Sequence, residues 1–88
     1  MTSRPNPFVT STAIGFSLPT SALVTLEVYD VAGRRVATLL NRERRAAGPQ
    51  QVVLDGSHLA SGVYLAYLEV DGRVSAQRIV LLRDAESR

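Results

Sequence analysis

The sequence predicts an all-β protein, an antiparallel β-sandwich of about seven short strands. Two observations support this prediction. Apolar and polar residues alternate along most of the chain, and residues typical of tight turns separate the alternating segments at roughly regular spacing. No segment shows convincing helical spacing, and there is no internal repeat. At 88 residues, the chain is long enough for one domain with one hydrophobic core.

An extended segment is expected at the start of the chain. The opening MTSRPNPF contains two prolines, and each proline favours extended geometry in the residue before it. Arg4 to Phe8 is therefore expected to be extended, with Phe8 covering an edge of the core. This piece could pair as a seventh strand. We expect residues 1–11 to form the N-terminal segment, 12–83 the sandwich and 84–88 a C-terminal tail.

Two strands with clear alternation follow. The first runs from Thr12 until Pro19 closes it, and the second is ALVTLEVYDV. Their period of two is hard to reconcile with a helix. The residues expected to face the core on these strands are Ile14, Phe16, Leu18, Val24, Leu26 and Val28.

Two turn signals predict hairpins. In Asp30-Val31-Ala32-Gly33, the aspartate can accept hydrogen bonds from the amides ahead of it. Gly33 can then take the positive φ of a type I turn with a G1 bulge. Asp71-Gly72 is among the strongest two-residue hairpin signals and leads into RVSAQRIVLLR. We expect structural roles for Asp30, Gly33, Asp71 and Gly72.

Between the hairpins, the sequence predicts two loops around a short strand. NRERRAAGP breaks the alternation and is expected to be the longest loop. QQVVLD follows as a strand with Val52 and Leu54 facing inward. A second irregular loop is expected from Asp55 to Ser61, with Leu59 packing inward to hold it against the domain.

The strand GVYLAYLEV is apolar on both faces, which indicates a central or doubly covered strand. Gly62 is expected to let the chain enter it from a cramped loop. Tyr64 supplies the largest apolar area on the face that it shares with Ala66, Leu68 and Val70. In the last strand, residues 79–82 are too uniformly apolar for their faces to be assigned.

The residue types offer little for catalysis, and we predict no catalytic residue, metal site or cofactor. The absence of cysteine excludes disulfides and thiolate chemistry. The lone histidine, His58, lies in a polar loop, and its neighbour Ser57 is framed by no nucleophile motif. The glycines form no nucleotide-binding motif. No apolar run reaches 18 residues, and the first 20 residues do not resemble a signal peptide.

The positive charge is carried by ten arginines spread along the chain, with a net charge of +2. A nucleic-acid-binding surface would be denser. RERR, residues 42–45, is the one charge run. We expect a solvated loop there, with contact to an anionic surface such as a phosphorylated glycolipid as the alternative. Only Tyr29 and Tyr67 are plausible outward rings for a carbohydrate.

Six segments in a fixed order carry a family resemblance. They are RPNPF, IGFSLP, VTLEVYDVAGRRVATLL, AAGPQQVVLDG, LASGVYLAYLEVDG and RIVLLR. Together, over about residues 5–83, they resemble the C-terminal sorting domain of the type 9 secretion system. The resemblance implies an immunoglobulin-like antiparallel β-sandwich at the end of a larger exported enzyme or adhesin of a Gram-negative bacterium.

The function implied by the resemblance is that of a non-catalytic transport signal. In this family, an outer-membrane machinery recognises the domain after its passage through the periplasm. A sortase-like peptidase typically removes it and joins the covalently linked cargo to surface lipopolysaccharide, so the cargo is secreted or attached to the cell surface. The residues implied to carry the signal are Gly62, Tyr64, Arg78, Ile79, Val80, Leu81, Leu82 and Arg83.

Two features depart from the family pattern, and two other functions remain open. Leu54 stands where relatives often carry a tryptophan, and DAESR continues past the last basic residue of the pattern. The alternatives are an immunoglobulin-like assembly domain of the flagellar hook-capping type and an accessory carbohydrate-binding module of a polysaccharide-degrading enzyme.

Overall fold

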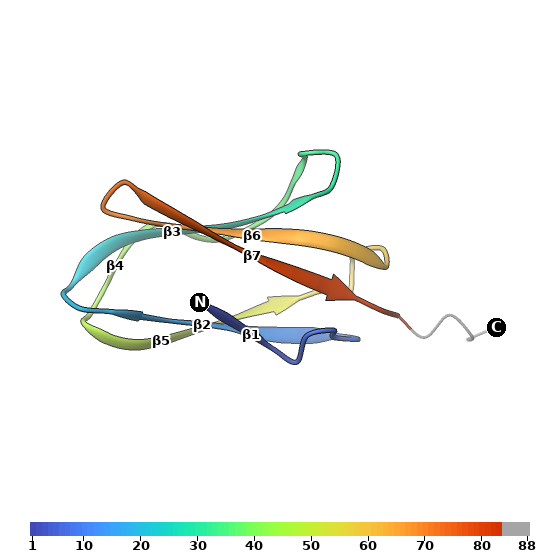
Figure 1. Cartoon of the computed structure of the whole chain (residues 1–88), viewed down its shortest axis with the longest axis horizontal. Coiled ribbons are helices and arrows are strands. Elements are labelled where there is room, and N and C mark those ends of the chain that lie inside the picture. Colours follow the sequence, from blue (N-terminus) through green and yellow to red (C-terminus); the bar gives the residue numbers. More distant parts are fainter. Residues whose placement is uncertain (84–88) are drawn as a thin grey trace.

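The computed structural model describes residues 1–83, which form seven strands in two stacked sheets (Figure 1). The expected tail, 84–88, lies outside the described residues. One sheet has three strands in the order β1-β2-β5, and the other has four in the order β4-β3-β6-β7. All strand pairs are antiparallel, so the predicted β-sandwich is confirmed. The strands are β1 (Thr2–Arg4), β2 (Ser11–Leu18), β3 (Ala22–Asp30), β4 (Arg35–Arg45), β5 (Gly48–Asp55), β6 (Gly62–Val70) and β7 (Arg73–Leu81).

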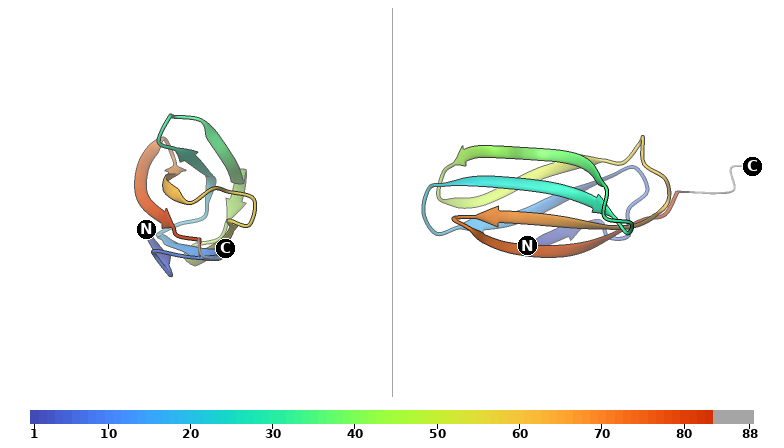
Figure 2. Two further views of the ribbon diagram at one scale, coloured as in Figure 1. Left: turned by 90° about the vertical axis from the view of Figure 1, so that its right-hand side faces the viewer. Right: turned by 90° about the horizontal axis from the view of Figure 1, so that it is seen from above.

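The core lies between the two sheets, which Figure 2 shows end on. The six residues expected to face inward on β2 and β3 are all buried, and so are Leu54 on β5 and Tyr64 on β6. Because side chains alternate between the two faces of a strand, a slip of one residue in register would expose each of these sets. The hydrophobic pattern therefore specifies the register.

The strand β6 is apolar on both faces because it is central, with β3 on one side and β7 on the other. Its outer face is only half covered, since Val63 and Tyr67 are each 36% exposed. The Tyr67 ring meets the Tyr29 ring of β3 edge to face, with 5.3 Å between the ring centroids. Such pairs add stabilisation beyond the buried area.

The prediction of a long loop over NRERRAAGP is wrong. Asn41 to Arg45 continue β4, which pairs with β3 as far as the partners Ala22 and Arg45, and only residues 46–47 separate β4 from β5. The pairing is irregular around Arg42, which has a φ of 51° and donates its amide to Thr25 Oγ1 at 3.2 Å. A bulge of this kind interrupts the two-residue alternation, so the sequence pattern resembled a loop.

The two hairpin turns have the geometry that their residues favour. Oδ1 of Asp30 accepts hydrogen bonds from the amides of Ala32 at 3.0 Å and Arg34 at 2.9 Å, and Gly33 has a φ of 86°. Asp71 and Gly72 both have positive φ, at 52° and 80°. Positive φ at both central residues defines the type I′ turn, whose twist matches that of the flanking strands.

The N-terminal segment is part of the sandwich. Thr2–Arg4 pairs with β2, and the buried Ser3 and Thr12 side chains hydrogen-bond each other at 2.7 Å. Phe8 is only 1% exposed, so it belongs to the core and not merely to its edge. Its ring lies so close to Gly56 that a Cβ there would be 2.7 Å from Phe8 Cε2. A glycine at position 56 therefore leaves room for the Phe8 ring. The sequence analysis did not identify this steric requirement.

Candidate functional site

The residues implied to carry a signal come from two distant segments, and the β6–β7 hairpin brings them together. In this pairing, Gly62 is opposite Leu81 and Tyr64 is opposite Ile79. The site therefore lies at the end of the hairpin where β6 begins and β7 ends, on the side of the molecule where the described chain finishes (Figure 1).

The last segment divides between the core and the surface. Ile79 and Leu81 are fully buried, whereas Val80 is half-buried and Arg78 is exposed. Leu82, just beyond β7, is 54% exposed. The alternation that the uniform apolar sequence concealed is thus resolved. Arg78, Val80 and Leu82 offer side-chain surface to another molecule, and so does the half-buried Arg83.

The side chain of Asn6 covers part of the outer edge of β7. Its Nδ2 donates to the Arg78 carbonyl at 2.9 Å, and its Oδ1 accepts from the Val80 amide at 3.0 Å. A carboxamide has both donor N–H groups and an acceptor oxygen, so it satisfies β7 as a neighbouring strand would.

The backbone of Phe8 continues the same cover. Its amide donates to the Val80 carbonyl, and its carbonyl accepts from the Leu82 amide, both at 2.8 Å. Phe8 thereby forms a parallel bridge with Leu81. We call Asn6–Phe8 the N-terminal clamp. An uncovered strand edge can pair with other chains, so the clamp restricts what can add to this end of β7.

Arg83 ties the end of the described chain to the β5–β6 loop. Its amide donates to Ser61 Oγ at 2.9 Å, and its guanidinium donates to the Gly56 carbonyl. Arg83, the last basic residue of the described chain, is therefore held against the loop that also receives Phe8.

Tyr64 and Gly62 have different surroundings. Tyr64 is 6% exposed, and its hydroxyl donates to the Ala60 carbonyl at 2.6 Å. This bond joins the core to the β5–β6 loop. Glycine is not needed at position 62 for space, because a Cβ there would meet no atom within 4 Å. Its φ of 157° is what favours glycine at this position.

Three titratable groups have pKa values that local hydrogen bonds explain. The amide of Arg34 is the main cause that lowers the pKa of Asp30, and the amide of Ser57 does the same for Asp55. Such bonds favour the charged carboxylate.

The pKa of Tyr29 is raised, mainly because its hydroxyl donates to the Glu27 carboxylate at 3.0 Å.

Residues 1–83 contain no group of three or more His, Cys, Asp and Glu residues that could hold a metal ion. His58 is exposed in the β5–β6 loop, and the Ser57 amide donates to Asp55 Oδ1 at 2.9 Å, which makes this aspartate a turn-capping residue. No helix in the same part of the chain is long and apolar enough to cross a membrane.

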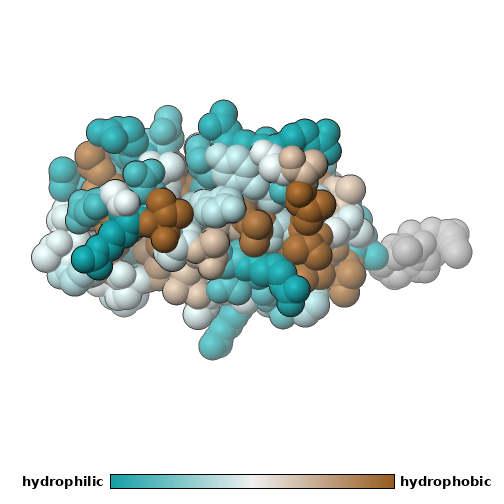
Figure 3. All heavy atoms as spheres, turned by 45° about the horizontal axis from the view of Figure 1, so that its top comes forward, coloured by the Kyte–Doolittle hydropathy of each residue, from teal (hydrophilic) through white to brown (hydrophobic). Residues whose placement is uncertain are grey.

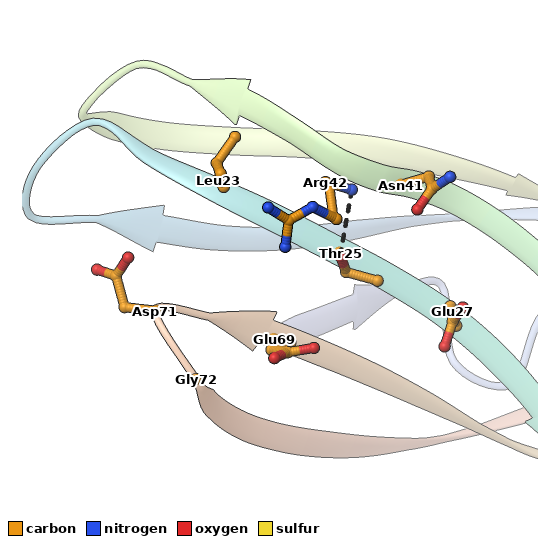
Figure 4. A pocket seen from close by; sticks show the side chains of 8 residues that line it. All are labelled: Leu23, Thr25, Glu27, Asn41, Arg42, Glu69, Asp71 and Gly72. Atoms are coloured by element: carbon orange, nitrogen blue, oxygen red, sulfur yellow. Dashed lines mark hydrogen bonds between the residues drawn. The ribbon is translucent and has the colours of Figure 1, made fainter.

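The outer face of the four-stranded sheet has a hollow of about 350 Å³ that carries charges of both signs (Figure 4). Glu69 and Asp71 lie on one side of it and Arg42 lies on the other. The rest of the RERR run is engaged locally, since Arg44 donates to Ser21 and Arg45 lies 3.6 Å from Glu43. Polar side chains also break up the apolar ones on this side of the molecule (Figure 3).

Comparison with protein families matches residues 4–82 to the secretion system C-terminal sorting domain. The chain belongs to this family. The match extends from the last residue of β1 to Leu82, so it includes the N-terminal clamp and the end of β7. No curated protein and no solved structure matches the chain.

The sorting domain is therefore a C-terminal signal for type 9 secretion, as the order of the sequence segments indicated. This role implies a cargo upstream in the same protein, a secretion machinery that handles it, and a destination outside the cell or on its surface. The flagellar and carbohydrate-binding alternatives gain no support from the comparisons.

Proposed function

We propose that the secretion machinery reads the sorting domain as a folded surface at the end of β7. This surface consists of Gly62, Tyr64 and Arg78–Arg83. The observation that supports it is the pairing of Gly62 with Leu81 and of Tyr64 with Ile79, which joins two segments far apart in the sequence.

Within this surface, the residues have two roles. Tyr64, Ile79 and Leu81 are buried, so they shape the end of the hairpin. Arg78 and Leu82 are exposed, so they contact the machinery directly. The clamp and the anchored Arg83 hold this short segment in one conformation, which lowers the entropic cost of its recognition.

The later steps follow the pattern that the family resemblance implies. The domain supplies a signal and no catalytic group, and a sortase-like peptidase removes it. The peptidase joins the cargo to surface lipopolysaccharide, which places the cargo on the outer membrane. Contact between the domain's arginines and a surface glycolipid belongs to the same proposal, because arginine pairs well with phosphate groups.

The test uses a fluorescent reporter directed to the periplasm of a type 9 host and fused to residues 1–88. Leu82→Ser is the test variant, and Val74→Ser is its matched control. Both residues are exposed and apolar, at 54% and 63%, but Val74 lies at the other end of β7. Secreted and periplasmic reporter are measured by fluorescence, with the host's own cargo as an internal reference.

We expect the parent and Val74→Ser fusions to leave the cell and the Leu82→Ser fusion to be retained, with all three domains folded by circular dichroism. Export of Leu82→Ser at the parental level would refute the proposed surface. Retention of the parent fusion, while the host's own cargo is still exported, would count against the sorting function in this host.

A further inference from the structure

The two sheets leave a groove open between β2 and β7, lined by both apolar and polar residues. It has a volume of about 630 Å³. Its apolar lining residues include Phe16 and Leu18 of β2, Leu68 and Val70 of β6, and Met1. These residues belong to the core or pack against it, so the groove is a gap in the core's cover.

The groove exists because β1 is shorter than its neighbour. β1 has three residues and β2 has eight, and the pairing of β1 begins with Thr2 opposite Gly15. Figure 1 shows that β1 runs beside only part of β2. On this edge of β2, residues 16–18 are therefore not paired with β1, although β5 pairs with them on the other edge.

The same gap explains the polar inner positions on β7. Ile79 and Leu81 point inward and are buried, whereas Arg73 and Ser75, on the same face of the strand, line the groove and are exposed. In a completed sandwich, a strand of the opposite sheet would lie across from them. Within residues 1–83, no strand of the opposite sheet covers the first half of β7.

We propose that the strand leading from the cargo into this domain fills the groove by continuing β1 in the upstream direction. Family membership places a cargo upstream. The antiparallel register determines how the strand would lie: Met1 falls opposite Phe16, the first upstream residue opposite Ser17 and the second opposite Leu18. Met1 is half-buried, packs against the core and lines the groove. A chain that continues upstream from Met1 therefore starts at the groove.

The register also determines which upstream side chain is buried. Ser3 points inward and is buried, and Thr2 is exposed, so Met1 and the second upstream residue share the inward face. That second residue would contact Leu18 and the apolar floor of the groove, whereas the first would face solvent. The groove therefore takes an extended peptide that is apolar at its second upstream position.

The test compares the 88-residue chain extended by Gly-Ser-Val-Thr with the same chain extended by Gly-Ser-Thr-Val. The two extensions have the same composition, but only the first places valine at the inward position. A Gly-Ser-Gly-Gly extension gives the baseline. Amide hydrogen exchange at residues 16–18 and the thermal midpoint are measured for all three, and amide exchange is also measured in the full-length protein with its natural cargo.

We expect the Val-Thr extension to slow exchange at one or more of these amides at least about tenfold and to raise the midpoint by roughly 3 °C or more over the baseline. The Thr-Val extension should give less than half of either effect. In the full-length protein, the same amides should be protected to the Val-Thr level. Equal behaviour of the two extensions, or baseline exchange in the full-length protein, would overturn the proposal. Neither measurement depends on export, so its outcome is separate from that of the sorting test.

Discussion

At the scale of single residues, the sorting domain relies on a few side chains that do more than fill volume. Tyr64 buries its ring and donates its hydroxyl to Ala60. Thr12 is 1% exposed and donates to the Pro5 carbonyl at 2.8 Å, which fixes the chain between β1 and the clamp. Alternation predicted that Tyr64 is buried, but the partners of these hydroxyls lie in loops that no sequence pattern specifies.

Replacing Tyr64 separates its packing from its hydrogen bond. Tyr64→Phe removes only the bond to Ala60 and should reduce the free energy of unfolding by about 1 kcal/mol. Tyr64→Ala also leaves a cavity and should cost about 3 to 5 kcal/mol, enough to unfold a small domain in part. Urea denaturation monitored by circular dichroism measures both. A Tyr64→Ala variant that melts within a few degrees of the parent would show that this ring is not a core element.

At the scale of elements, the clamp joins the two ends of the chain. Asn6 lies 72 and 74 residues from its partners Arg78 and Val80, so no local pattern reveals the contact. The sequence indicated an extended segment around RPNPF, and the structure adds what that segment covers. Similarly, the two-residue period predicted β2, β3 and β6, but the bulge at Arg42 concealed the second half of β4.

Replacing Asn6 tests the clamp. Asn6→Ala removes both side-chain bonds and should lower the free energy of unfolding by about 1 kcal/mol, because these bonds are near the surface. Exchange of the Val80 amide should accelerate in the same variant. Asn6→Asp keeps an acceptor for Val80 but loses the donor to Arg78, so it should retain the protection of the Val80 amide. Unchanged exchange of this amide in Asn6→Ala would rule out the contribution of Asn6 to the clamp.

The β3–β4 turn predicts a pH dependence. The amides of Arg34 and Ala32 hold the pKa of Asp30 below the ordinary value of 3.8. A lowered pKa in the folded state stabilises the protein above the unfolded pKa, and this contribution is lost as the pH falls through the folded pKa. Asp30→Asn should therefore flatten the decline in unfolding free energy below about pH 4, measured by urea titrations at several pH values. A decline as steep as in the parent would assign the acid sensitivity to other carboxylates, such as Asp55, whose pKa is also lowered.

At the scale of the whole molecule, the fold and the family followed from the sequence, while the shape of the site did not. Alternation placed the inward residues of β2, β3, β5 and β6, and the order of six segments indicated the sorting domain that the family match confirms. The faces of residues 79–82 depended on the pairing of β7 with β6 and on the clamp, both of which are long-range contacts.

In the proposed function, the signal is a surface displayed by the whole fold and not a linear peptide. The most direct measurement compares export of a periplasmic reporter fused to residues 1–88 with export of the same reporter fused to residues 62–88, at matched expression in a type 9 host. The second fusion contains every proposed signal residue but lacks the opposite sheet and the clamp. Only the reporter fused to the complete domain should be exported, and equal export of the short fusion would show that the signal is a linear peptide.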